Sequence, residues 1–187
     1  LTYAELGDLE LAFADYTTTI EIDPEYIQAY IQRSWIYFRK AEYDRAKRDC
    51  QSAIALDQGC FWANYILGVV NSLLGLKNNA LTNFTKAIET FPNYVSARYH
   101  RGILHHYLGD LPKAMADFEQ ARSIQDKGLE RLVDRDETGF YAEGLALHYL
   151  GQPEAARKIL TLGALSAKRF NNPSFHKLIQ SSIEGLG

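Results

Sequence analysis

A 34-residue period runs through the first two thirds of the chain. Three registers repeat at this spacing, each with side chains of one size class: Gly7, Ala41, Gly75 and Gly109; Ala12, Ala46, Ala80 and Ala114; and Tyr16, Cys50, Phe84 and Phe118. Three registers in phase indicate a tandem repeat rather than a chance spacing. A period of this length with helical composition predicts a solenoid of helix–turn–helix units.

Each period contains two apolar stripes at helical spacing, separated by a short turn. Between residues 61 and 94 the first stripe consists of Ala63, Leu67, Val70 and Leu74, and the second of Ala80, Leu81, Phe84, Ala87 and Ile88. These intervals of three and four residues place each set on one helical face. Gly75 separates the stripes because it tolerates a positive φ, and Pro92 ends the second because it has no N–H for the helical ladder.

The small residues of the repeat have a packing role. We expect Gly68 and Ala80 to let the two helix backbones approach, while Phe84 fills the gap to the next pair. Neither helix can bury its stripe alone, so consecutive repeats must stack on one another.

These residues resemble the tetratricopeptide repeat, whose pattern includes Leu-Gly, then Ala, three residues and Phe, then Pro. Leu67-Gly68, Ala80, Phe84 and Pro92 match it, whereas Asn64 and Asn71 replace its aromatic positions. The resemblance implies an all-α, right-handed superhelical solenoid of antiparallel helix pairs. We expect about four and a half repeats followed by a capping helix.

The phase divides the chain into one repeat domain. Its expected parts are a partial repeat (1–26), three repeats (27–60, 61–94 and 95–128), an insertion (129–136), a divergent repeat (137–170) and a capping helix (171–187). The insertion lengthens the second helix of the preceding repeat or forms an extra turn. The last helix begins at Asn172-Pro173. It covers the final repeat or, alternatively, folds into its own groove or a neighbouring molecule's.

The composition is that of a soluble protein. The chain is 47% hydrophobic and 23% charged, with a net charge of −3, so nothing favours binding to nucleic acid or to an anionic membrane. No apolar run approaches the roughly 20 residues needed for membrane insertion. Cys50 and Cys60 do not form a disulfide framework, which favours a cytoplasmic compartment. Because the chain starts at Leu1 in mid-repeat, we expect further sequence upstream.

In the family that this chain resembles, the first helix of each pair lines a concave surface. The resemblance assigns sixteen residues to a partner-binding groove: Gln28, Ile31, Gln32, Trp35, Arg39, Trp62, Tyr65, Ile66, Val69, Tyr99, His100, Ile103, His106, Tyr107, Tyr141 and His148. Many of them are large and aromatic, as binding hot spots are. Alternatively, these rings pack between neighbouring first helices or are covered by another part of the chain.

Two sharper functions find no support. Some relatives clamp a chaperone's C-terminal carboxylate with Lys, Asn and Arg, but the matching positions carry Ile31, Trp35, Ile66, Ser96 and His100. A phosphate loop, a nucleophile elbow and a metal-ligand spacing are also missing from the sequence. We therefore expect neither an enzyme nor a bound cofactor or metal.

The predicted function is a scaffold that binds a partner protein or peptide in an apolar, aromatic groove. Two alternatives remain. The chain could be a regulatory or substrate-recruiting segment of a larger enzyme, or a module that associates with itself as a homo-oligomer.

Overall fold

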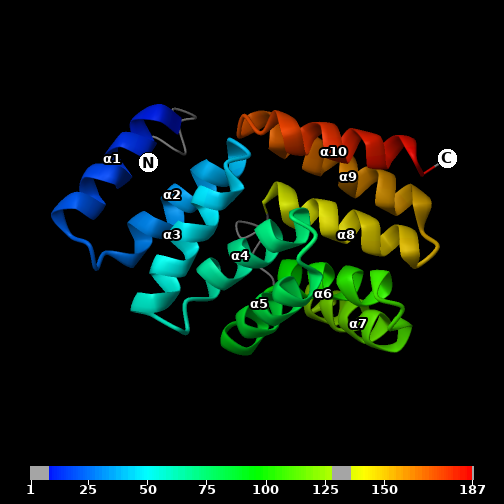
Figure 1. Ribbon diagram of the computed structural model, residues 1–187. Coiled ribbons are helices and arrows are strands. Elements are labelled where there is room, and N and C mark those ends of the chain that lie inside the picture. Colours follow the sequence, from blue (N-terminus) through cyan, green and yellow to red (C-terminus); the bar gives the residue numbers. More distant parts are fainter. Residues whose placement is uncertain (1–8, 128–135, 187) are drawn as a thin grey trace.

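The computed structural model describes residues 9–127 and 136–186, which form ten helices joined by short turns (Figure 1). They are α1 (Leu9–Ile22), α2 (Ile27–Arg39), α3 (Tyr43–Leu56), α4 (Phe61–Leu73), α5 (Lys77–Thr90), α6 (Val95–Tyr107), α7 (Leu111–Asp126), α8 (Glu137–Tyr149), α9 (Pro153–Arg169) and α10 (Pro173–Glu184). The predicted all-α helical-repeat fold is confirmed.

The helices form hairpins, α2 with α3, α4 with α5, α6 with α7 and α8 with α9. The turns fall where the repeat phase predicts them. The second residue after the first helix of each pair has a positive φ: 57° at Ala41, 74° at Gly75, 81° at Gly109 and 71° at Gly151. Gly7, the first member of this register, lies outside the described residues.

Within the hairpins, a small residue on the first helix packs against a larger side chain on the second. A Cβ atom placed on Gly68 would lie 2.7 Å from the Phe84 ring, and one on Gly102 would lie 2.5 Å from the Phe118 ring. Atoms this close would overlap, so the expected role of Gly68 is confirmed. The first complete hairpin has Ser34 at the glycine position, and there the smaller Cys50 replaces the phenylalanine. Both residues are buried, so the volume lost by replacing phenylalanine with Cys50 offsets the volume added by replacing glycine with Ser34.

A second feature alternates between repeats. Arg33 forms a two-pronged ion pair with Asp49, with both N–O distances 2.8 Å, and Arg101 pairs in the same way with Asp117. The intervening repeat has Leu67 at the arginine position. Its place is taken by amide hydrogen bonds that Asn83 makes with Asn64 and Asn71. Each of these three hairpins is thus fastened by its own polar contact.

The hairpins stack regularly until α8. The helix α4 packs on α3 and α6 packs on α5, so each first helix normally lies on the preceding second helix. In contrast, α8 packs principally on α6, the preceding first helix. The preceding helix α7 has 16 residues against 14 in α5. Of the expected insertion, only Asp136 belongs to the described residues.

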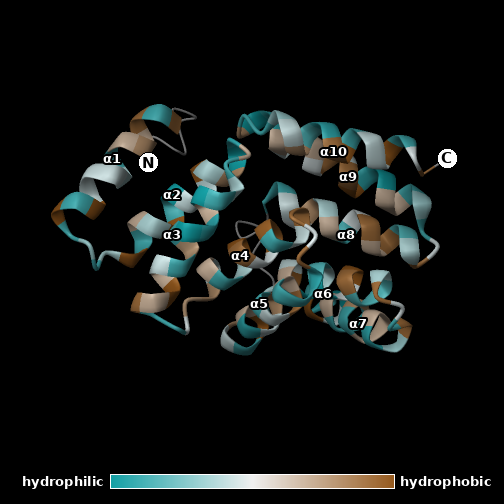
Figure 2. Cartoon of the chain, viewed as in Figure 1, coloured by the Kyte–Doolittle hydropathy of each residue, from teal (hydrophilic) through white to brown (hydrophobic). Residues whose placement is uncertain are grey.

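This placement brings the last three helices, which we call the C-terminal module (α8–α10), onto the inner side of the array. In Figure 1, α8 lies near the middle of the molecule, between α4–α7 and the pair formed by α9 and α10. The strongly apolar α4 also lies near the centre, where Figure 2 shows it largely brown. The helix α10 packs on α9 as a cap, and it also contacts α2. There the Phe38 and Phe175 rings lie 5.8 Å apart.

Candidate partner-binding site

The structure places the sixteen predicted groove residues at very different depths. Seven are buried, namely Ile31, Tyr65, Ile66, Val69, Tyr99, His100 and Ile103. Six are half-buried, namely Gln32, Trp35, Arg39, Trp62, His106 and Tyr141. Three are exposed, namely Gln28, Tyr107 and His148. Several of the buried side chains meet the C-terminal module, so much of the concave surface is in contact with this chain itself.

A group of polar side chains joins that module to the repeats, and we call it the closing cluster. It consists of Arg39, Tyr65, Asp136, Glu137, Thr138 and Asn172. The Tyr65 hydroxyl lies 2.6 Å from Thr138 Oγ1, and Thr138 donates to Asp136 Oδ1. Glu137 Oε1 lies 3.4 Å from Arg39 Nε and accepts from the Asn172 amide at 3.5 Å. The cluster therefore connects α2 and α4 with the start of α8 and with the start of α10.

Buried charge dominates the closing cluster. The Glu137 side chain is fully buried, and its Oε2 atom has no partner among the described residues. Burial, followed by the neighbouring Glu137, raises the pKa of Asp136 to about 6. A carboxyl group removed from water favours its neutral form. The Arg39 guanidinium, whose central carbon lies 4.3 Å from the Phe170 ring centroid, supplies positive charge here.

His100 is a second buried polar group on the concave side. Its ring stacks on Phe84, with the centroids 5.1 Å apart. Burial lowers the pKa of His100 to about 3, although a hydrogen bond with the Thr138 backbone opposes this shift. The ring is therefore neutral at physiological pH. Its Nε2 atom has no hydrogen-bond partner among the described residues.

A pocket of about 300 Å³ remains where the concave face meets the C-terminal module, and we call it the inner pocket. Its lining comes from α4, α6, α8 and α10 and the start of α5: Val69, Ser72, Leu73, Lys77, His100, Ile103, Leu104, Tyr107, Tyr141, Leu145, Phe175 and Leu178. Five of these were predicted groove residues, namely Val69, His100, Ile103, Tyr107 and Tyr141. Phe175 and Leu178 were predicted only as part of the capping helix, because the sequence does not reveal that α10 reaches back to α2.

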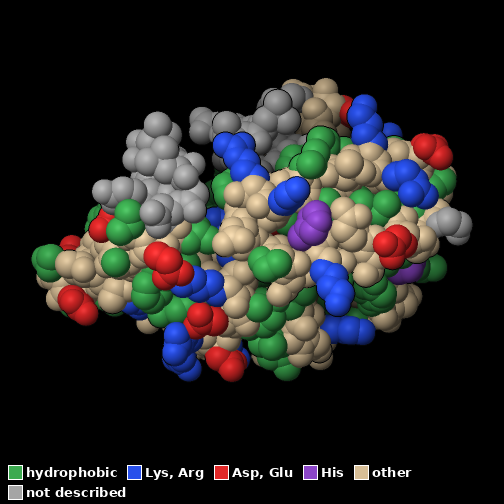
Figure 3. Space-filling view, turned by 90° about the horizontal axis from the view of Figure 1, so that it is seen from above, with side chains coloured by type: hydrophobic (Ala, Val, Ile, Leu, Met, Phe, Trp, Pro, Cys, Tyr) green, Lys and Arg blue, Asp and Glu red, His purple; other side chains and the backbone are tan. Residues whose placement is uncertain are grey.

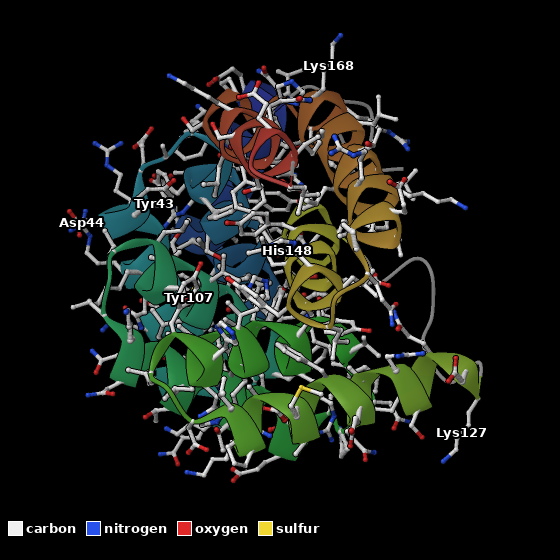
Figure 4. The ribbon with its side chains drawn as sticks, turned by 90° about the vertical axis from the view of Figure 1, so that its right-hand side faces the viewer. Tyr43, Asp44, Tyr107, Lys127, His148 and Lys168 are labelled. Carbon is white, nitrogen blue, oxygen red and sulfur yellow. The ribbon has the colours of Figure 1, made fainter. Side chains whose placement is uncertain are left out.

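The predicted residues at the start of the array line a separate, more open hollow. Gln28, Ile31 and Trp62 lie there, at the first turns of α2 and α4. Gln32, Trp35, Arg39, Tyr65, Ile66, Tyr99, His106 and His148 line neither hollow. His106 stacks on Tyr149 with ring centroids 4.0 Å apart, while His148 is exposed on the face shown in Figure 4. Among the described residues, no three His, Cys, Asp or Glu side chains are grouped so that they could hold a metal ion.

Exposed apolar side chains gather at two turns, and two of them, Leu73 and Tyr107, also line the inner pocket. We call the whole group the turn edge: Leu73, Leu74 and Leu76 at the α4–α5 turn, and Tyr107, Leu108, Leu111 and Met115 at the α6–α7 turn. Lys77 links the two turns, because its Nζ lies 5.6 Å from the Tyr107 ring centroid. Tyr107 is 57% exposed and is labelled in Figure 4. The turn edge thus groups the exposed apolar residues of two turns that Lys77 brings together, and of these the repeat pattern assigned only Tyr107 to the groove.

The face formed by α9 and α10 has a different character. Figure 3 looks onto it and shows Lys and Arg side chains spread over the surface, with Asp and Glu among them. Lys168, Arg169 and Lys177 are exposed on these two helices. Within the described residues, no helix is long and apolar enough to cross a membrane.

Comparisons with known proteins identify the repeat. One tetratricopeptide repeat model matches residues 74–128, and another matches residues 1–26 and 27–60. The chain is 30% identical to the photosystem I assembly protein Ycf3 of Acaryochloris marina over 87 residues, which cover 45% of this chain and 52% of that protein. It is 28% identical to the Hsp70-Hsp90 organizing protein 1 of Arabidopsis thaliana over 115 residues, 62% of this chain and 19% of that one.

The fold is also similar to a solved structure. YrrB, described as a tetratricopeptide repeat protein with an unusual peptide-binding site, superposes with a TM-score of 0.59 at 25% identity. The match covers 96% of this chain and 86% of YrrB. This chain matches about half the length of the first curated relative and about a fifth of the length of the second. The repeat matches and the helical architecture agree, and the chain belongs to the tetratricopeptide repeat family.

Proposed function

We propose that this chain is a protein-interaction scaffold that holds an apolar segment of a partner protein at the turn edge. Tetratricopeptide repeats are protein-interaction modules, and the scaffold itself carries out no chemistry. The partner segment lies over the α4–α5 and α6–α7 turns and reaches the mouth of the inner pocket.

The distribution of exposed apolar side chains carries this proposal. Seven of the thirteen large hydrophobic residues that are exposed among the described residues belong to the turn edge. A concentration of exposed apolar side chains commonly marks an interaction site. Tyr107, which is 57% exposed, is of the residue type that contributes most often to binding hot spots.

This docking site is narrower than the groove expected from the repeat pattern. Tyr65, Ile66 and Tyr99 are too deeply buried to meet a partner while the C-terminal module stays in place. Of the expected groove residues, Tyr107 and His148 are exposed near the inner side of α6 and α8. The positions that would hold a carboxylate clamp include Ile31, Ile66 and Ser96, which are buried and uncharged. The partner is therefore recognised by apolar contacts.

The relatives support an interaction role. One is named for photosystem I assembly and another for organising two chaperones, and YrrB is described as having a peptide-binding site. By analogy, the function of this chain is to hold partner proteins in a fixed arrangement. The chemical nature of the partner follows from the turn edge, not from these names.

The test is a pull-down from native lysate with the double variant Leu108→Glu/Leu111→Glu. Both leucines are exposed, so the folded state, monitored by circular dichroism, stays unchanged. Introducing two charges into an apolar interface should remove the specific partner, because buried charges without partners are strongly unfavourable.

The matched control is Leu162→Glu/Leu165→Glu, which changes two exposed leucines on α9. This control should retain the partner. Retention of the partner by the turn-edge variant would contradict the proposal. Sedimentation of the wild type at several concentrations tests the self-association alternative. A molar mass that rises with concentration in the wild type, but not in the turn-edge variant, would identify the partner as a second copy of this chain.

A further inference from the structure

The inner pocket contains polar atoms that its own walls do not satisfy. Most of its lining is apolar, including Val69, Ile103 and Leu145. Two lining residues carry buried side-chain atoms without hydrogen-bond partners among the described residues, His100 at Nε2 and Ser72 at Oγ. His100 as a whole is only 8% exposed. Leaving such atoms unpaired is costly, so an occupant of the pocket that offers a hydrogen-bond partner is favoured over a purely apolar one.

The size of the pocket limits the ligand. Its volume of about 300 Å³ lies at the lower end of the range for small-molecule sites. It is about twice the size of an engineered apolar cavity that holds benzene. A single aromatic ring with a short side chain fits this space.

The mouth of the pocket adds a charge. Among the described residues that line the pocket, Lys77 alone is charged at neutral pH, because His100 is neutral. Lys77 is exposed, and no ion pair with a described acidic residue occupies its ammonium group. A carboxylate at the mouth would form a charge-assisted hydrogen bond with it.

We propose that the inner pocket binds a small hydroxyaryl carboxylic acid, with the carboxylate on Lys77, the ring between α6 and α8, and the hydroxyl at His100 Nε2 and Ser72 Oγ. A hydroxyl group both donates and accepts a hydrogen bond. It therefore pairs with Nε2 in either neutral form of the imidazole.

Through this site, a small molecule would change the stability of the closed arrangement, in addition to the docking of a partner protein. The pocket walls come from the repeats on one side and from the C-terminal module on the other. A ligand that binds only the closed arrangement stabilises it by mass action. The inference does not rest on the docking of a partner protein, since it concerns a different ligand and a different measurement.

The experiment compares three probes: para-hydroxyphenylpropionate, phenylpropionate without the hydroxyl, and para-hydroxyphenylpropanol without the carboxylate. Binding is measured by saturation-transfer NMR titration, and the melting temperature is followed in parallel. We expect the hydroxy acid to bind about five- to tenfold more tightly than either of the others, the range expected for one lost hydrogen bond. Failure of the hydroxy acid to bind, or equal affinities for all three probes, would overturn the proposal.

Two variants localise the binding. Leu145→Trp fills the pocket from α8 and should abolish binding of the hydroxy acid, with circular dichroism used to check the fold. Lys77→Gln should weaken both acids about five- to tenfold and leave the alcohol unchanged. Lys86→Gln, on the exposed side of the same helix α5, is the matched control and should bind as the wild type does.

Lys77→Gln decides the matter even if Leu145→Trp does not fold, because Lys77 is exposed at the start of α5. Unchanged affinity of the acids in Lys77→Gln would overturn the proposed orientation. Binding that persists in a folded Leu145→Trp protein would show that the probes bind elsewhere.

Discussion

The regular repeats and the C-terminal module use the same hairpin but attach it differently. Within the hairpins, Gly102 faces Phe118 and Gly144 faces Leu160, so a glycine against a large side chain sets both pairs. Between hairpins, α6 lies on α5, whereas α8 lies chiefly on α6. The repeat pattern therefore encodes the hairpin, while other residues determine where the hairpin is placed.

Several of those other residues are polar, beside apolar contacts such as that of Phe38 with Phe175. The regular hairpins are fastened internally by pairs such as Arg33–Asp49, on the flank of the array. The C-terminal module is attached through the closing cluster, in which Glu137 is fully buried. A buried charge is unfavourable unless a specific partner lies beside it. An arrangement of the helices that supplies the partner is therefore strongly favoured over arrangements that do not. A few residues outside the repeat pattern thus fix the position of three helices.

The sharpest test of this comparison removes one large side chain from each region. Phe84→Ala should lower the free energy of unfolding by about 4 kcal/mol, because it leaves a cavity beside Gly68. Leu160→Ala should cost about 3 kcal/mol, with the loss confined to the C-terminal module. Urea denaturation measures the totals, and hydrogen exchange measured by mass spectrometry locates them. Equal loss of protection in α4–α7 upon Leu160→Ala would show that the two regions unfold as one.

Breaking the attachment should have a slightly smaller effect. Arg39→Ala leaves Glu137 as a buried charge without its cation, which should reduce stability by about 3 kcal/mol. The control is Arg45→Ala, which breaks an exposed pair with Glu42 and should cost less than about 0.5 kcal/mol. Hydrogen exchange should accelerate in α8–α10 for the first variant only. Similar behaviour of both variants would mean that the closing cluster does not hold the C-terminal module.

The smallest expected effect concerns pH at the boundary between the two regions. The folded pKa of His100 is about 3, against about 6.5 when unfolded, so the unfolded chain binds the extra proton between these values. The free energy of unfolding is therefore highest above pH 6.5, where His100 is neutral in both states. It falls as the pH falls, by about 2 kcal/mol at pH 5, because only the unfolded chain binds the proton. His100→Phe should remove this loss.

Urea denaturation of both proteins at pH 5 and pH 7.5 measures the difference. Asp136 acts in the opposite direction, because its raised pKa makes the folded chain bind the extra proton between about pH 4 and pH 6. Its contribution is present at low pH and declines as the pH rises. It is common to both proteins, so their difference isolates His100. An identical pH dependence in the two proteins would contradict a buried, neutral His100.

The sequence predicts local features of this molecule better than distant ones. The repeat phase predicts the turn at Gly75 and the close helix packing at Gly68 because both depend on residues within one period. Periodicity also places Tyr65 on the inner face of its helix. It cannot tell what covers that face, since Thr138 lies in a different repeat, beyond an insertion whose length does not fix its path.

The inner pocket illustrates the same limit. Val69 and Ile103 are apolar residues at inner positions, and sequence alone predicts them. Phe175 and Leu178 form part of an apolar stripe that fits a cap on α9 equally well. Their second contact depends on the path of the whole C-terminal module. The sequence contains one local sign that this junction is unusual. Two acidic residues, Asp136 and Glu137, lie at the start of the divergent repeat.

The contact between Phe38 and Phe175 also affects how the chain folds. In an open solenoid each repeat contacts only its neighbours, so folding can start anywhere and spread along the array. Here two residues far apart in the sequence must meet, and closing so long a loop carries an entropic cost before the contact forms. The resulting increase in contact order slows folding relative to an open array of the same length. Contact between α2 and α10 thus requires most of the chain between them to be in place.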